Sequence, residues 1–146
     1  MTPNMISACE RHVGTYMQQL HPDVPVVFTG QAVPKHAPIY VRFYVVPSEE
    51  VVQMSLGPQA KSRNVGLVHA AVIGPKDEGA GDTGEIAEHI RIMFHRVPLE
   101  VSGEGWVKFK DGGVVDAGDK EEEHMVITRV PYEYDFLSKT LESLTS

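Results

Sequence analysis

Apolar residues alternate with polar or aromatic ones from Ile39 to Val45, and this two-residue period constrains the fold more than any other feature of the chain. Successive side chains of a strand point to opposite faces, so the alternation predicts a long strand with one buried face. The expected core face carries Ile39, Val41, Phe43 and Val45, and the opposite face carries Tyr40, Arg42 and Tyr44. A chain of 146 residues, 42% of them apolar, can bury a single core, so we expect one domain spanning 1-146.

Further short apolar segments, separated by turn residues, predict additional strands. They lie at 24–28, 51–56, 65–73, 106–110, 114–117 and 125–134. The turn chemistry at 47–50 predicts an antiparallel hairpin of the 39–45 strand with the 51–56 strand, and 111–113 predicts a second hairpin. Pro131 has no N–H for a ladder, which places it at a sheet edge or a bulge.

Two segments have the spacing of an amphipathic helix. The first carries Ile6, Cys9, Val13, Tyr16 or Met17, and Leu20, and the second carries Ile86, Ile90, Met93, Phe94 and Val97. Leu137, Leu141 and Leu144 predict a short third helix at the C-terminal end. Together these elements predict an α+β fold, in which an antiparallel or mixed β-sheet is packed against an N-terminal helix and a second, central amphipathic helix.

The acidic balance of the chain restricts its partners. The formal net charge of −7 argues against a surface that grips nucleic acid, because such surfaces cluster Lys and Arg. Cys9 is the single cysteine, and no signal-peptide pattern or membrane-spanning apolar run is present in the sequence. We therefore expect a reducing, cytoplasmic compartment and no membrane partner.

The glycines Gly79, Gly81 and Gly84 form a G-x-G-x-x-G pattern ahead of the second helix. A dinucleotide site needs such glycines directly after a parallel strand, where backbone N–H groups meet the pyrophosphate. Here five residues of exposed turn chemistry, 74–78, separate the preceding strand from Gly79. The pattern therefore indicates a flexible loop, and a small-ligand site built on it remains an alternative.

Candidate catalytic and metal-binding groups are isolated in the sequence. None of the seven histidines has the spacing of metal ligands, and Cys9 on the apolar stripe of the first helix predicts a buried, inert thiol. Glu85 and His89 are spaced as a solvated i, i+4 pair, and His69 lies within a predicted strand as a half-buried structural histidine. We expect no enzyme activity, no cofactor and no metal.

Aromatic and basic residues on the predicted strands are candidates for an interface instead, because Tyr and Arg dominate protein interfaces. The face of Tyr40, Arg42 and Tyr44 either packs under a helix of the same domain or meets a neighbouring subunit. Tyr132 and Tyr134 on the last strand leave the same two alternatives. Lys61 and Arg63 form a locally basic segment and complete the candidate set.

The order of elements and two motifs resemble the tail-terminator, or tail-completion, proteins of long-tailed bacteriophages and related tail-like particles. The first motif runs from Gly84 to Phe94 as G-E-I-A-E-H-I followed by Phe94, and the second is V-P-Y-E-Y from Val130 to Tyr134. The resemblance covers most of the chain, and the residues that carry it are structural.

The resemblance implies a small α+β subunit of the virion, made in the host cytoplasm, that closes into a homo-hexameric ring on the head-proximal end of the tail tube. Its implied partners are other copies of itself, the tail-tube protein and a neck or head-completion (stopper) protein, with DNA only passing through the lumen. Such a ring stops tube polymerisation and needs no catalytic group. Another head-tail connector or minor tail protein is the alternative within the same class.

Overall fold

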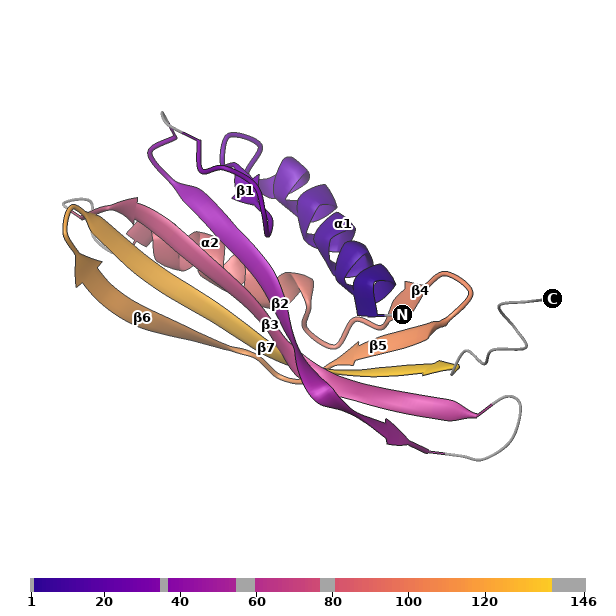
Figure 1. Ribbon diagram of the computed structural model, residues 1–146. Coiled ribbons are helices and arrows are strands. Elements are labelled where there is room, and N and C mark those ends of the chain that lie inside the picture. The colour runs from indigo at the N-terminus through magenta and orange to yellow at the C-terminus, as the bar shows by residue number, and fades with distance from the viewer. Residues whose placement is uncertain (1, 35–36, 55–59, 77–80, 138–146) are drawn as a thin grey trace.

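The structure is a computed structural model, and it describes residues 2–34, 37–54, 60–76 and 81–137. A mixed, curled seven-stranded sheet carries two helices on one face, which confirms the α+β fold (Figure 1). The elements are α1 (Thr2–Leu20), β1 (Val26–Val27), β2 (Tyr40–Gln53), β3 (Lys61–Pro75), α2 (Gly81–Met93), β4 (Leu99–Val101), β5 (Gly105–Phe109), β6 (Gly113–Lys120) and β7 (Glu123–Leu137).

Three long antiparallel strands, β2, β3 and β7, form the middle of the sheet. The order of strands is β1-β2-β3-β7-β5-β4, and β6 also pairs with β7. Only β1 runs parallel to its neighbour, pairing Val26 with Val41, and it makes the sheet mixed. The long strands extend past both helices, so one end of the sheet projects as an arm (Figure 1).

The core lies between the helices and one face of the sheet. Three members of the stripe predicted on α1, Cys9, Val13 and Met17, are buried there and at most 2% exposed. Ile6 is only half-buried, and Leu20 is 51% exposed at the end of the helix. From β2, Val41 and Phe43 enter the same core, as the two-residue period predicts. The rings of Phe43 and Phe94 stack at 6.1 Å between centroids, which joins the sheet to the segment after α2. The alternation of β2 and the stripe of α1 therefore form two sides of one core.

The first predicted hairpin is wrong. Residues 47–50 are not a turn but an irregularity within β2, and the antiparallel partner of 39–45 is β3, with Phe43 opposite Ala70. The register shifts between Pro47 and Val51. Residues 51–53 therefore continue β2 along β3 instead of folding back on 39–45, and residues 55–56 of that predicted strand lie outside the described residues.

The second predicted hairpin is also wrong, because β5 and β6 do not pair with each other. Both pair with β7, at successive stretches: Phe109 lies opposite Tyr132 and Gly113 opposite Arg129. Pro131 lies opposite the break between them, where its carbonyl oxygen accepts the N–H of Lys110 at 2.9 Å. Pro131 thus sits inside the sheet, beside an interruption of the neighbouring strand and not at an edge.

Two smaller expectations have definite outcomes. Helix α2 begins at Gly81, so Gly84 belongs to the helix and not to a loop. Leu137 ends β7, and the rest of the predicted C-terminal helix, as well as residues 77–80, lies outside the described residues.

Candidate assembly interface

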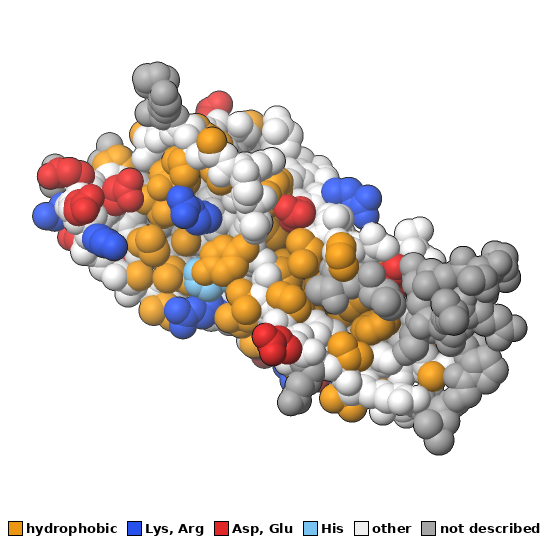
Figure 2. Space-filling model, in the orientation of Figure 1, with side chains coloured by type: hydrophobic (Ala, Val, Ile, Leu, Met, Phe, Trp, Pro, Cys, Tyr) orange, Lys and Arg blue, Asp and Glu red, His pale blue; other side chains and the backbone are white. Residues whose placement is uncertain are grey.

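The sheet face that points away from the helices holds the first group of predicted interface residues. Because Val41 and Phe43 point into the core, Tyr40, Arg42 and Tyr44 point to the opposite face. No helix of the described residues covers this face, and Figure 2 shows hydrophobic side chains gathered across it. Of the two alternatives left open, packing under a helix therefore does not occur within the described chain.

The outer face, as we name this uncovered side of the sheet, is apolar along most of its rows. Paired residues of adjacent strands share a face, so the register identifies its members. They include the exposed Val46 and Val115 and the half-buried Leu67, Met125 and Ile127. Apolar side chains that gather on one uncovered face are typical of an interaction surface, so we treat this face as a candidate interface.

An aromatic stack lies in the middle of the outer face. The rings of Tyr44 and His69 are 4.4 Å apart between centroids and inclined by 26°. His69 is half-buried, as predicted, and burial lowers its pKa, with the neighbouring Arg129 charge lowering it further. The stack therefore presents a neutral aromatic surface at pH 7.

Tyr132 and Tyr134 are core residues, so the prediction that they belong to an interface is corrected. Their side chains are 1% and 0% exposed, and they point toward the helices together with Val130 and Phe136. Burial raises the pKa of both hydroxyls, which each donate a hydrogen bond inside the domain. The physical reason is the register: the polar residues 129, 133 and 135 alternate with them and take the outer face.

Tyr132 belongs to a buried polar chain that holds the irregularity of β2. Its hydroxyl donates to Oδ1 of Asn64 at 2.8 Å, and Nδ2 of Asn64 donates to the carbonyl oxygen of Ser48 at 2.9 Å. A Cβ at Gly66 would lie 2.6 Å from the Tyr132 hydroxyl and would also collide with the carbonyl oxygen of Val46. The sequence did not predict this role of Asn64, because no local pattern indicates that an asparagine within a strand will bond to a buried side chain.

Tyr134 belongs to a second buried polar group, centred on the carboxylate of Glu104. Oε2 of Glu104 accepts the Tyr134 hydroxyl at 2.8 Å, and Oε1 accepts Nδ2 of Asn4 at 2.7 Å. The N–H of Leu137 also bonds to the Glu104 carbonyl oxygen at 3.1 Å. This turn residue, which sequence reasoning also missed, therefore ties the start of α1 to the end of β7.

Lys61 and Arg63 lie on the arm, within β3, and Arg63 is not part of an open basic patch. Nε of Arg63 donates to Oδ1 of Asp135 at 2.6 Å and Nη2 to Oδ2 at 3.0 Å, while Nη1 lies 3.7 Å from Oε2 of Glu133. This pairing lowers the pKa of Asp135 and raises that of Arg63. Glu133 and Asp135 lie 70 and 72 positions further along the chain than Arg63. The local sequence therefore indicated a positive charge at Arg63, and in the fold these two carboxylates compensate it.

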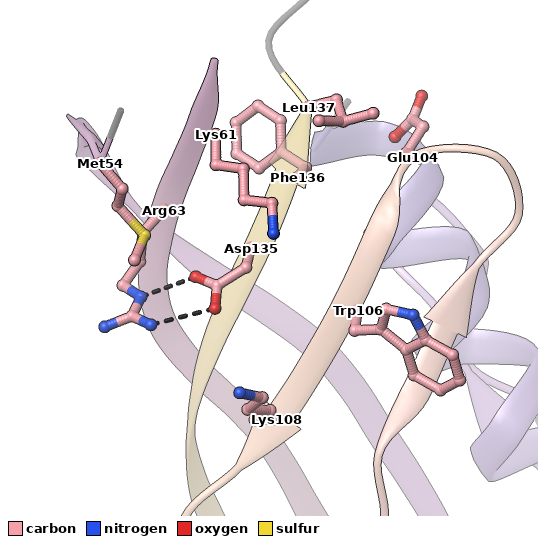
Figure 3. A pocket seen from close by; sticks show the side chains of 9 residues that line it. All are labelled: Met54, Lys61, Arg63, Glu104, Trp106, Lys108, Asp135, Phe136 and Leu137. Atoms are coloured by element: carbon pink, nitrogen blue, oxygen red, sulfur yellow. Dashed lines mark hydrogen bonds and ion pairs between the residues drawn. The ribbon is translucent and has the colours of Figure 1, made fainter. Parts of the chain in front are cut away.

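A groove of about 430 Å³ opens beside this ion pair (Figure 3). Its lining consists of Met54, Lys61, Arg63, Glu104, Trp106, Lys108, Asp135, Phe136 and Leu137. Trp106 and Leu137 remain 48% and 43% exposed. Tryptophan, methionine and arginine are enriched at protein interfaces, so the groove adds to the candidate surface. The sequence predicted the strand of Trp106 only as half of a hairpin, so Trp106 was not identified as a candidate interface residue.

The residues considered for other chemistry have different surroundings. Strand β3, which precedes the glycine pattern, pairs with β2 and β7 and is antiparallel to both, so a βαβ nucleotide unit is not formed there. Cys9 is fully buried as predicted, and burial raises its pKa to about 12. Within the described ranges, no three His, Cys, Asp or Glu side chains are grouped to hold a metal ion. In the same part of the chain, none of the helices has the length and apolarity to cross a membrane.

The predicted pair of Glu85 and His89 is present, with Oε1 and Nε2 3.9 Å apart. His89 has a second partner that the sequence did not indicate, because Nδ1 lies 2.8 Å from Nε2 of His21, at the end of α1. Burial lowers the pKa of His21, and the neighbouring His89 lowers it further. The two imidazoles therefore connect the helices.

Comparisons with known proteins identify solved structures with a similar fold, but they do not identify a family for this chain. No protein-family model matches the chain, and no curated protein matches its sequence. One similar solved structure, whose name carries no functional description, is 18% identical with a TM-score of 0.75 and aligns over 95% of this chain and 99% of its own. Another is a chain in the "Virion of native gene transfer agent (GTA) particle", 12% identical, with a TM-score of 0.54 over 90% of this chain and 93% of its own.

Proposed function

We propose that this protein is a structural subunit of a phage-like particle and acts as its tail terminator. In this role, copies of the chain close into a hexameric ring on the head-proximal end of the tail tube, stop its polymerisation and join the tail to neck proteins. The observation that carries the proposal is the fold, because a chain of the gene transfer agent virion has the same fold over 90% of this chain. The motifs at Gly84–Phe94 and Val130–Tyr134 support the narrower role through their resemblance to tail terminators.

The outer face supports an assembly role independently of the fold. Tyr40, Arg42 and Tyr44 lie on it among exposed apolar side chains, which is the chemistry of a protein interface. Closed rings are built from one surface of each copy meeting a different surface of the next. An uncovered, aromatic face on one side of an otherwise charged molecule is suited to such a contact.

The role we propose does not involve covalent chemistry. The thiol of Cys9, a candidate nucleophile, is protonated at pH 7 because burial raises its pKa. The acidic net charge of −7 suits a subunit that surrounds passing DNA, since like charge keeps phosphates from adhering to it. We therefore propose a virion protein that is not an enzyme and carries no cofactor.

A different head-tail connector or a minor tail protein is the second candidate. The likeness to a chain of a whole virion supports this candidate as well, because it refers to the particle and not to a position in the tail. The two candidates differ in their effect on tube length, since only a terminator limits it.

Deletion of the gene in a particle-producing system tests the proposal. We expect capsids without attached tails and tail tubes of uncontrolled length, measured by electron microscopy. Substitutions of candidate chemical groups, Cys9→Ala and His89→Ala, should leave particle assembly unchanged. Tails of normal length joined to full heads after deletion would overturn the terminator role, and tubes of normal length that fail to join heads would favour the connector.

A further inference from the structure

Two arginines on the outer face have no acidic partner within the described chain. Arg42 on β2 and Arg129 on β7 are both exposed, and neither takes part in an ion pair among the residues that the structure describes. Between them lie the stacked rings of Tyr44 and His69, and Arg129 is opposite His69 in the register. We name these four residues the arginine patch.

The spacing of the arginine patch suits a short acidic segment. Arg42 and Arg129 are separated by one strand, β3, and by two residues along the strand direction. With strands about 4.8 Å apart and about 3.3 Å per residue, their Cα atoms are separated by roughly 12 Å. Two guanidinium groups on long side chains can converge over the aromatic stack from that separation, and each offers a planar fork to a carboxylate.

The turn between β6 and β7 has the complementary charge. Glu121, Glu122 and Glu123 are exposed, and the described part of the chain holds no ion pair to any of them. Figure 2 shows acidic side chains gathered at the end of the molecule where this turn lies. The neighbouring Asp116 and Asp119 differ, because both are engaged by His124. We name Glu121, Glu122 and Glu123 the acidic tip.

The acidic tip cannot reach the arginine patch of its own chain. Arg129 and Glu123 belong to the same strand, β7, and are six residues apart. At about 3.3 Å per residue in a strand, they are separated by roughly 20 Å. Since β6 and β7 are paired up to Glu123, the tip is held at this distance. The two complementary surfaces can therefore meet only between different molecules.

We propose that the acidic tip of one copy docks on the arginine patch of the next copy, in a head-to-tail contact that repeats around the ring. This inference rests on the proposed function for the ring, and it adds the residues and the partner of one joint. The patch is surrounded by exposed or half-buried Val46, Leu67 and Ile127, which a protein partner would cover. A nucleic acid would instead need a track of positive charge, which an acidic chain with two arginines here lacks.

Charge reversal on each side of the contact tests the proposal. The patch variant is Arg42→Glu with Arg129→Glu, and the tip variant is Glu121→Lys with Glu123→Lys. Self-association of purified protein is measured by sedimentation, and folding by circular dichroism and thermal melting. Each variant alone should weaken self-association by roughly 100-fold or more, because like charges then face each other in every joint.

Two restorations separate this contact from a general effect of charge. A chain that carries all four reversals should associate like the wild type, since its tip and patch are complementary again. An equimolar mixture of the patch variant and the tip variant should also associate, because each joint can form between unlike chains. The charge control, Arg11→Glu with Arg96→Glu, makes the same change in net charge outside the patch and should associate like the wild type. Because Arg96 pairs with Asp111 at 3.5 Å, the folding of this control is checked by the same thermal melting.

The outcomes that overturn the proposal are distinct from those that overturn the proposed function. Wild-type self-association in the patch variant, or no restoration by the four reversals, would show that the joint lies elsewhere. So would a wild-type protein that is monomeric up to roughly 1 mM. If the patch variant instead assembles normally but loses retention on DNA, the patch is a nucleic-acid surface. Tail length and attachment after gene deletion test the terminator role separately from all of these measurements.

Discussion

Gly66→Ala should destabilise the fold, because a side chain at this position meets the backbone of the neighbouring strand. Its Cβ would collide with the carbonyl oxygen of Val46 and lie 2.6 Å from the Tyr132 hydroxyl. Val46 directly precedes the irregularity of β2, and Tyr132 donates to Asn64, which in turn holds Ser48. The methyl group would therefore strain the buried polar chain that shapes the arm.

The magnitude follows from two opposing contributions. Replacing a glycine in a strand interior with alanine gains about 0.5–1 kcal/mol, because alanine loses less backbone freedom on folding. Overpacking a well-filled interior costs about 1–3 kcal/mol, and contact with a backbone oxygen belongs at the upper end because the backbone cannot rotate away. The net loss is about 2 kcal/mol, which lowers the melting temperature of a chain of this size by roughly 4–8 °C.

The assay is thermal and urea unfolding of Gly66→Ala beside a matched glycine. Gly14→Ala is the control, because Gly14 lies inside α1 with no atom within 4 Å of the new Cβ. That change should stabilise the protein by up to about 1 kcal/mol. Adding Tyr132→Phe to Gly66→Ala removes the hydroxyl from the collision, so the two losses should be less than additive by at least about 0.5 kcal/mol.

Equal and positive effects of Gly66→Ala and Gly14→Ala on the melting temperature would refute this reasoning. Such a result would mean that β2 and β3 can separate locally without loss of stability. Strict additivity of Gly66→Ala and Tyr132→Phe would contradict the specific contact with the hydroxyl, even if Gly66→Ala were destabilising by itself.

Three further predictions concern ionisable groups. The hydrogen bond to Asp119 raises the pKa of His124. The stability that this pair adds is therefore complete below the unfolded pKa of 6.5 and is lost as the pH rises through the folded pKa. Asp119→Asn should lower the pKa of His124 in an NMR titration. Arg63 lowers the pKa of Asp135. The contribution of this pair to stability is therefore present above the unfolded pKa of 3.8 and is lost as the pH falls through the folded pKa. Arg63→Gln should raise the pKa of the Asp135 carboxyl, and an unchanged titration would contradict the pairing. Cys9 should react with a thiol reagent only after unfolding, since its pKa is raised to about 12, and rapid reaction in the native protein would exclude the buried position.

The local pattern of the chain determined the two helices of the described residues and most of the side chains that they bury. The stripe of Cys9, Val13 and Met17 needs only the 3.6-residue period to reach the core, and Val41 and Phe43 need only the two-residue period. Both periods are properties of the backbone and act over a few residues, so they can be read without knowing any partner. The inert thiol and the clean core face of β2 were predicted for this reason.

Alternation also holds for Tyr132 and Tyr134, but it does not say which of the two faces of a strand is buried. The signal that decides this was present in the sequence, since Arg129, Glu133 and Asp135 occupy the alternate positions and belong in water. Residue type alone left two alternatives for the tyrosines, packing inside the domain or contact with a neighbouring subunit. Reading the whole strand by its charged positions would have placed them in the core.

Only the tertiary structure decided which strands are neighbours. A run that alternates will pair with any strand of suitable length, and the turn chemistry at 47–50 and 111–113 favoured local hairpins. In the folded chain, β7 is long enough to pair with β3 over its whole length and with both β5 and β6 on its other side. Those contacts bring Arg63 to Asp135 and Tyr132 to Asn64 across 72 and 68 positions. Pairing of this kind depends on the free energy of the complete sheet and not on any one segment, so it cannot be read from local sequence.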